Sequence, residues 1–185
     1  MAEEVDCAVS FRPTRVSTWA VMAMAAIGFG QAARAANAPG SSLDIIELRQ
    51  TDQSLRDTYA RGKKMGLPRM VMLDAQGRLI YGQTGERNNL RMHLHEALEK
   101  DKPIPVAITL SAVLEETQDR DGKPVTVESL PKADAYVVDY WASWCAPCRM
   151  LSRDLEGILG HWDGVHIVWL KVESDPTKLP EKSRK

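Results

Sequence analysis

The chain has 185 residues, a length that suits one domain with a proper hydrophobic core. Its formal net charge of −1 gives no electrostatic reason to expect nucleic acid or acidic lipid as a partner.

Residues 1–35 are typical of an export signal. Arg12 and Arg15 precede the apolar run VSTWAVMAMAAIGFG, and the small-residue site Ala33-Arg34-Ala35 follows it. The run is short for a bilayer span, and the acidic extreme N-terminus is unusual for a signal. We expect cleavage near Ala35 and a periplasmic or otherwise extracytoplasmic protein. A retained membrane anchor and a buried helix are the alternatives.

Cleavage at that site would leave two cysteines, because it also removes Cys7. Both remaining cysteines belong to one motif, Cys145-Ala146-Pro147-Cys148. An exported protein with a single close pair has no disulfide framework, so the pair is there to react or to bind something.

The remaining chain predicts alternating strands and helices. Its first half, residues 51–100 with a short β-like run at 43–48 before it, reads as strand, helix, strand, turn, strand and helix. A connector over 101–107 begins with DKPIP, and residues 108–185 read as a hairpin around Asp121-Gly122, a strand, a helix and a strand. The other expected elements are a helix from 51 to about 64, strands at 70–73 and 79–81, a helix at 88–100, a buried strand at 135–144, a helix after the cysteines and a strand at 165–172. This order indicates a layered α/β domain.

The position of the cysteines predicts thiol chemistry. Cys145 follows the apolar strand and Cys148 lies one turn into the next helix, whose N-terminus favours a thiolate. We expect Cys145 to be exposed and to attack, and the more buried Cys148 to resolve the mixed disulfide. Pro147 suits a first-turn position. Asp139, an acid inside the apolar strand, would have a raised pKa and could exchange the proton of Cys148; a structurally paired acid is the alternative.

The string VDYWASWCAPC resembles the strand-to-active-site signature of the thioredoxin family, including the acid at Asp139 and the tryptophan before the first cysteine. The preceding DRDGKPVTVESL is similar to exported thioredoxin-like reductases. Ala146-Pro147 departs from the usual Gly-Pro, which leaves the direction of electron flow open. The family's lysine in the following strand is not cleanly matched, since Trp169 falls nearest and Lys171 lies two residues on.

The resemblance also implies a proline loop, a hairpin and a last helix, and these elements come before the cysteines here. YARGKKMGLPRMVMLDAQGRLIYGQTG resembles the loop and hairpin, with Leu67-Pro68 at the cis-proline position and Gly85 closing the second strand. We therefore predict one circularly permuted thioredoxin-like three-layer domain over 36–185. A swapped dimer and a broken remnant without a proline loop near its sulfurs are the alternatives.

The spacing of the cysteines and histidines also resembles a zinc site, a reading that we reject. Cys145, Cys148, His161 and His166 have the spacing of a Cys2His2 finger, but a buried strand precedes the cysteines and the histidines fall on different elements. We expect no metal and no cofactor.

The predicted function is an exported thiol–disulfide oxidoreductase, with reduction of protein disulfides favoured over oxidation by resemblance. Trp144, Pro147, Leu67 and Pro68 would face the substrate, whereas Trp141 reads as core. A reductase in an oxidising compartment needs a membrane-borne electron donor. A monomer is expected. The competing class is a binding module whose cysteines hold a soft metal or a structural disulfide.

Overall fold

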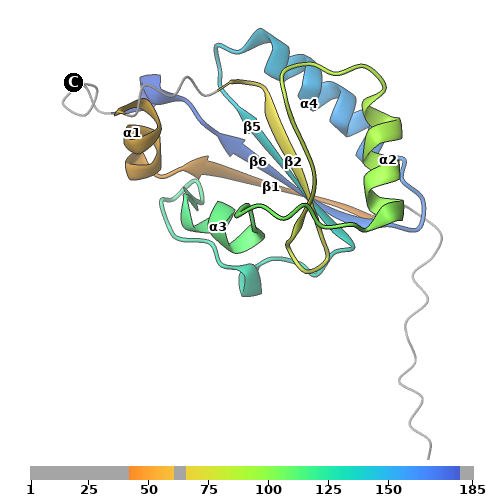
Figure 1. The fold of residues 1–185 in the computed structure, drawn as a ribbon. Helices are drawn as coiled ribbons and strands as arrows, with labels where there is room; N and C mark the ends of the chain where they lie inside the picture. Colours follow the sequence, from red (N-terminus) through yellow and green to blue (C-terminus); the bar gives the residue numbers. More distant parts are fainter. Residues whose placement is uncertain (1–41, 61–65, 180–185) are drawn as a thin grey trace, which may run out of the picture. The chain divides into compact units, whose positions relative to one another are not determined.

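A mixed six-stranded sheet forms the centre of the domain in the computed structural model, which describes residues 42–60 and 66–179 (Figure 1). The predicted export signal lies outside these residues. The strand order is β3-β2-β5-β6-β1-β4. The strands are β1 (Ser42–Gln50), β2 (Arg69–Asp74), β3 (Leu79–Thr84), β4 (Thr117–Gln118), β5 (Ala135–Trp141) and β6 (His166–Glu173). The helices are α1 (Asp52–Ala60), α2 (Leu90–Lys100), α3 (Leu110–Glu115) and α4 (Ala146–Leu159), with short 3-10 turns η1 (Val127–Ser129) and η2 (Pro176–Lys178).

Strand β5 is a central strand of the sheet, with neighbours on both sides. It runs parallel to β6 on one side and antiparallel to β2 on the other, and only its last residue, Trp141, is not buried. The near-continuous apolar sequence AYVVDYW follows from burial on both faces. Strand β6 in turn runs parallel to β1 over eight residue pairs.

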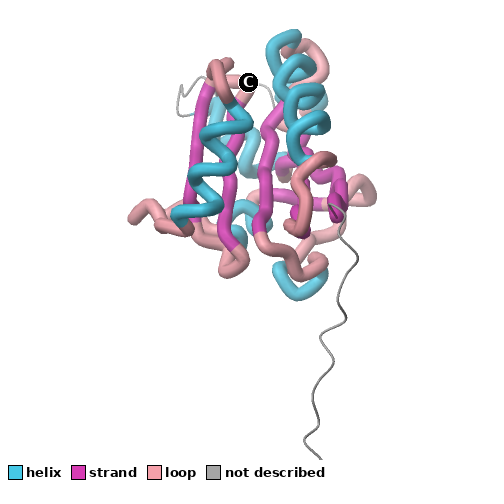
Figure 2. The backbone as a smooth tube through the Cα atoms, turned by 90° about the vertical axis from the view of Figure 1, so that its right-hand side faces the viewer, coloured by secondary structure: helices cyan, strands magenta, loops and turns pink. Residues whose placement is uncertain are grey.

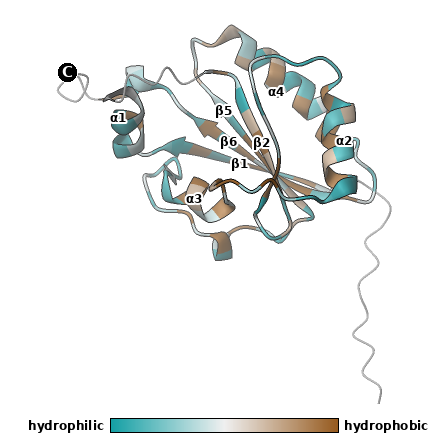
Figure 3. Cartoon of the chain, viewed as in Figure 1, coloured by the Kyte–Doolittle hydropathy of each residue, from teal (hydrophilic) through white to brown (hydrophobic). Residues whose placement is uncertain are grey.

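Helices cover both faces of the sheet, which gives three layers (Figure 2). On one face, α4 and α2 bury Leu155 and Leu94 against Val137 and Trp169. On the other face, α3 buries Leu110, Val113 and Leu114 in a second cluster with Val138 and Leu170. Figure 3 shows hydrophobic residues along the central strands, whereas α1 is largely hydrophilic. The expected layered α/β fold is confirmed.

The predicted elements agree with the observed ones except between the two halves. The expected hairpin around Asp121-Gly122 is reduced to its turn, in which Gly122 has a φ of +83° and a single bridge joins Gln118 to Pro124. Residues Leu110–Glu115 form helix α3 instead of a β-prone flank. The side chain of Thr109 accepts a hydrogen bond from the Ala112 N–H and caps this helix, and its apolar residues recur at helical spacing.

The halves of the sequence meet inside one sheet. Strand β2, from the first half, pairs with β5 from the second, and β1 pairs with β6. Apart from α3 and the reduced hairpin, the order of the elements is the one expected from the sequence. That it arose by transposing the halves of a family domain stays a prediction.

Candidate active site

The two cysteines lie where β5 gives way to α4. Cys145 is the N-cap residue of the helix and forms a disulfide with Cys148, with the two Cα atoms 5.3 Å apart. The Cys148 N–H also donates to Cys145 Sγ at 3.1 Å. Pro147 is exposed in the first turn of α4, where its missing N–H costs nothing. The helix N-terminus therefore faces the sulfur of Cys145, and it would favour a thiolate there.

Both sulfur-bearing residues are buried, which corrects the expectation of an exposed Cys145. Cys145 is 4% exposed and Cys148 is 1% exposed. Ala142 forms a small apolar cluster with the two cysteines, and Leu67 and Trp141 pack against it. These neighbours cover the disulfide, and Cys145 is the more accessible of the two residues by a small margin.

The proline loop lies at the same end of the sheet as the disulfide. The antiparallel register pairs Arg69 with Tyr140 and Met70 with Asp139, so the residues before Arg69 lie beside those that follow Tyr140. Leu67 packs against the disulfide cluster, the Leu67–Pro68 peptide bond is cis, and Pro68 is buried. The Gly85 N–H donates to the Pro68 carbonyl at 2.7 Å, which ties the loop to the end of β3. The structure thus brings Leu67 into contact with the cysteine cluster, and Pro68 is the next residue of the same loop.

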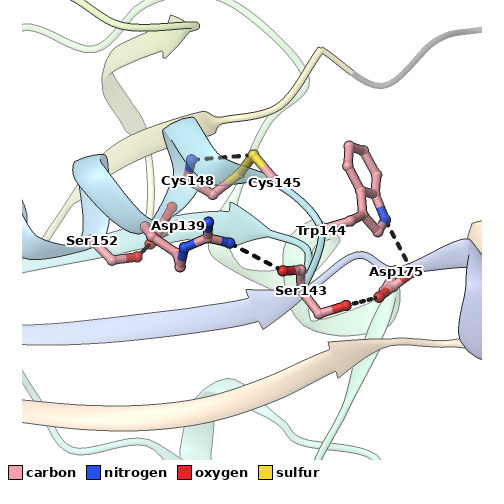
Figure 4. The surroundings of a disulfide bond; sticks show 8 residues. Asp139, Ser143, Trp144, Cys145, Cys148, Ser152 and Asp175 are labelled. Atoms are coloured by element: carbon pink, nitrogen blue, oxygen red, sulfur yellow. Dashed lines mark hydrogen bonds between the residues drawn. A yellow bond between two sulfur atoms is a disulfide. The ribbon is translucent and has the colours of Figure 1, made fainter.

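Asp139 is a fully buried acid on the α4 side of the sheet (Figure 4). Burial raises the pKa of its carboxyl from 3.8 to about 6, while the hydrogen bond from Ser152 and the positive charge of Lys171 oppose that rise. The Ser152 hydroxyl donates to Oδ2 at 2.7 Å, and Oδ1 has no hydrogen-bond partner in the described part of the chain. A carboxyl with a pKa near 6 can take up and release a proton near neutral pH.

Lys171 is the lysine that the sequence left in doubt. The parallel register of β5 and β6 pairs it with Asp139, two residues beyond Trp169. Its ammonium nitrogen lies 4.8 Å from the centroid of the Trp169 ring. The charge of Lys171 therefore acts on Asp139 from the neighbouring strand.

Trp144 stands at the rim of the disulfide, with 55% of its surface exposed. Its indole N–H donates to Asp175 Oδ1 at 3.2 Å, and the Ser143 hydroxyl donates to Oδ2 of the same carboxylate at 2.6 Å (Figure 4). Thr177 adds two further donors, from its N–H and its hydroxyl. Burial alone would raise the pKa of Asp175, but these hydrogen bonds outweigh it and lower the pKa. Asp175 therefore anchors the loop that carries Trp144.

Trp141 is half-buried, in line with its reading as core. Its side chain packs against the disulfide cluster. Its indole nitrogen is buried without a hydrogen-bond partner among the residues described.

Sequence reasoning missed Ser143, Ser152 and Asp175. Ser152 follows Cys148 by one helical turn, so helical spacing alone could have pointed to it. Asp175 begins a turn with the sequence Asp-Pro-Thr, a common capping pattern, but nothing local places it beside Trp144.

Two features are absent from the described ranges, 42–60 and 66–179: a cluster of metal-binding side chains and a membrane-spanning helix. Within them, no cluster of three or more His, Cys, Asp and Glu residues could hold a metal ion. No helix in these ranges is both long and apolar enough to cross a bilayer.

Comparison with known proteins points to one family. Residues 123–183 match the family model for thioredoxin. The chain is 42% identical over 40 residues to a thioredoxin of Streptomyces clavuligerus, which is 22% of this chain and 37% of that protein. It is 36% identical over 50 residues to a thioredoxin of Thiocapsa roseopersicina, which is 26% of this chain and 55% of that protein. Over this segment the chain is similar to thioredoxins.

The match to these thioredoxins is partial. The thioredoxin of Chlorobaculum thiosulfatiphilum is 38% identical over 55 residues, which cover 29% of this chain and 51% of that protein. The chain thus spans about a third to a half of the length of the thioredoxins described here. No solved structure matches it. The thioredoxin-like segment holds β5, α4 and β6, and with them both cysteines and Asp139.

Proposed function

We propose that the protein is an exported thiol–disulfide oxidoreductase that reduces disulfides in other proteins. The observation that carries this proposal is the arrangement of three features around the end of β5: the Cys145–Cys148 pair at the start of α4, the buried acid Asp139 and the Leu67-Pro68 loop. The partial match to thioredoxins supports the same chemistry.

Reduction of a substrate begins with both cysteines as thiols. The Cys145 thiolate, favoured by the helix N-terminus, attacks one sulfur of a protein disulfide, and the other substrate sulfur leaves as a thiolate. A mixed disulfide now joins Cys145 to the substrate. The exposed Trp144 and Pro147 and the Leu67-Pro68 loop border the site at which the substrate chain would lie.

Release of the substrate needs Cys148 as a thiolate. The proton of the Cys148 thiol passes to Asp139, and the thiolate attacks the Cys145 sulfur, so that the Cys145–Cys148 bond forms while the bond to the substrate breaks. The substrate leaves with two thiols and the protein keeps the disulfide seen in the structure. A further round needs an electron donor, for which we propose a membrane-borne dithiol protein.

The test is catalytic reduction of insulin disulfides with dithiothreitol as the electron source. We expect Cys145→Ser to abolish turnover and Cys148→Ser to accumulate a mixed disulfide through Cys145. Cys7→Ser is the matched control and should keep full activity, because residues 1–35 are predicted to be removed. Protein recovered from the periplasm of an expressing bacterium should begin at Ala36 by mass spectrometry.

Two results would contradict the proposed function. Stoichiometric retention of Cu(I) without turnover would replace the enzyme by a binding module. Turnover that survives Cys145→Ser would contradict the assignment of the nucleophile.

A further inference from the structure

Ser152 stands out because its hydroxyl leaves its own helix. A serine inside a helix commonly donates to the carbonyl four residues before it, which for Ser152 belongs to Cys148. Here the hydroxyl crosses from α4 to the sheet and donates to Asp139 Oδ2 at 2.7 Å. Oδ1 of Asp139 has no hydrogen-bond partner among the described residues, the buried cluster on this face of the sheet is apolar, and Lys171 on β6 is the charged neighbour.

The two oxygens of the Asp139 carboxyl therefore differ in their hydrogen bonding. Oδ2 is held by Ser152, whereas Oδ1 is buried and without a partner among the described residues. Ser152 follows Cys148 by four residues on the same helix, so both side chains lie on the face of α4 that covers β5. Figure 4 shows Asp139 next to Ser152, with the disulfide at the start of the same helix.

We propose that Ser152 is a positioning residue for the exchange: its hydroxyl holds Oδ2 of Asp139 and leaves Oδ1 as the oxygen that accepts the proton of the Cys148 thiol. This inference rests on the proposed function. In the releasing step the S–H bond of Cys148 breaks and its proton binds Oδ1. The Cys148 thiolate then forms a bond to the Cys145 sulfur, while the substrate–Cys145 bond breaks and its electron pair leaves on the substrate sulfur, which takes up a proton from water. The protein is oxidised to its disulfide and the substrate disulfide is reduced to two thiols.

Ser152 also sets the pH at which Asp139 gives up its proton. The charged group that acts on this carboxyl is Lys171, its neighbour on β6, while β2 contributes the uncharged Met70. Cys148, one turn before Ser152 on α4, is held in the disulfide of the oxidised protein. Without the hydroxyl, neither oxygen of Asp139 would have a hydrogen-bond partner within the described ranges, and the ionised form would lose the bond from Ser152. Such a loss raises the midpoint of the titration by about one to two pH units.

The experiment is an infrared titration of the protonated Asp139 carboxyl in the oxidised full chain, with Asp139→Asn used to assign the band. We expect Ser152→Ala to raise the midpoint by about one to two pH units and Ser152→Thr, which keeps the hydroxyl, to restore it. Ser111→Ala is the matched control, because the Ser111 hydroxyl, like that of Ser152, donates to a carboxylate, in this case that of Glu115 at the protein surface. In the insulin assay, the acid limb of the pH profile should move with the titration.

Two results would overturn the proposal: a Ser152→Ala midpoint equal to that of the unmodified protein, or a Ser152→Thr midpoint shifted as far as that of Ser152→Ala. The titration needs no turnover. If the unmodified protein fails to reduce insulin, the proposed function is contradicted. The titration midpoint would still show whether the Ser152 hydroxyl lowers the pKa of Asp139.

Discussion

Asp139 is the residue at which stability and chemistry conflict. Its pKa rises from 3.8 to about 6 on folding. Well below pH 3.8 the carboxyl is protonated in both the folded and the unfolded state, so its ionisation does not change the stability. Between pH 3.8 and about 6 it ionises more readily in the unfolded chain, and the free energy of unfolding falls. Above about pH 6 this loss of stability is complete. We expect Asp139→Asn, which resembles the protonated acid, to raise the free energy of unfolding at pH 7.5 by up to about 3 kcal/mol.

Urea denaturation at neutral and at acid pH measures this effect. The gain of Asp139→Asn should shrink toward zero as the pH falls below 4, while the exposed Asp154 on α4 is a control whose Asn variant should show no such pH dependence. A gain that persisted unchanged in acid would contradict a titration origin. Insulin reduction by the same variant should fall, since it cannot take the Cys148 proton.

At this scale the sequence predicted the acid but not its partner. An acid inside an apolar strand is visible in the string VVDYW. The Ser152 contact crosses 13 residues and the Ser143–Asp175 contact crosses 32, and each depends on how α4 and η2 pack on the sheet. The spacing of residues within one helix or strand does not predict contacts between residues that are far apart in the sequence.

At the scale of elements, α4 holds the cysteines in place through its buried face. Leu155 is fully buried between α4 and the strands. We expect Leu155→Ala to lower the free energy of unfolding by about 2–5 kcal/mol, because it leaves a cavity in a packed core. Chemical denaturation measures this, and Glu156→Ala on the exposed face of α4 should change the stability by less than about 0.5 kcal/mol. Equal losses for both variants would show that the helix is held by something other than this face.

Most elements were predictable because their apolar periodicity is strong. Strands β2, β5 and β6 and helices α2 and α4 lie within a few residues of their expected positions. Helix α3 was not predicted, because it is short and its segment contains β-branched residues beside the Asp-Gly turn. Its cap at Thr109 was the available signal.

At the scale of the whole molecule, one chain holds the complete site. Leu67 packs against the disulfide cluster of its own chain, so a second copy has no missing part to supply. We expect light scattering to give the mass of a monomer, and activity per mole of protein to stay constant across a wide dilution series. A swapped dimer would instead lose activity on dilution.

The pairing of β1 with β6 has a consequence for how the chain is made. The earliest described strand and the latest one are neighbours along their whole length (Figure 1). A ribosome must therefore synthesise the chain as far as β6 before the sheet can close, and contacts of such high order slow folding. Until β6 has been made, β1 lacks its parallel neighbour, and a late-closing sheet would suit the export proposed above.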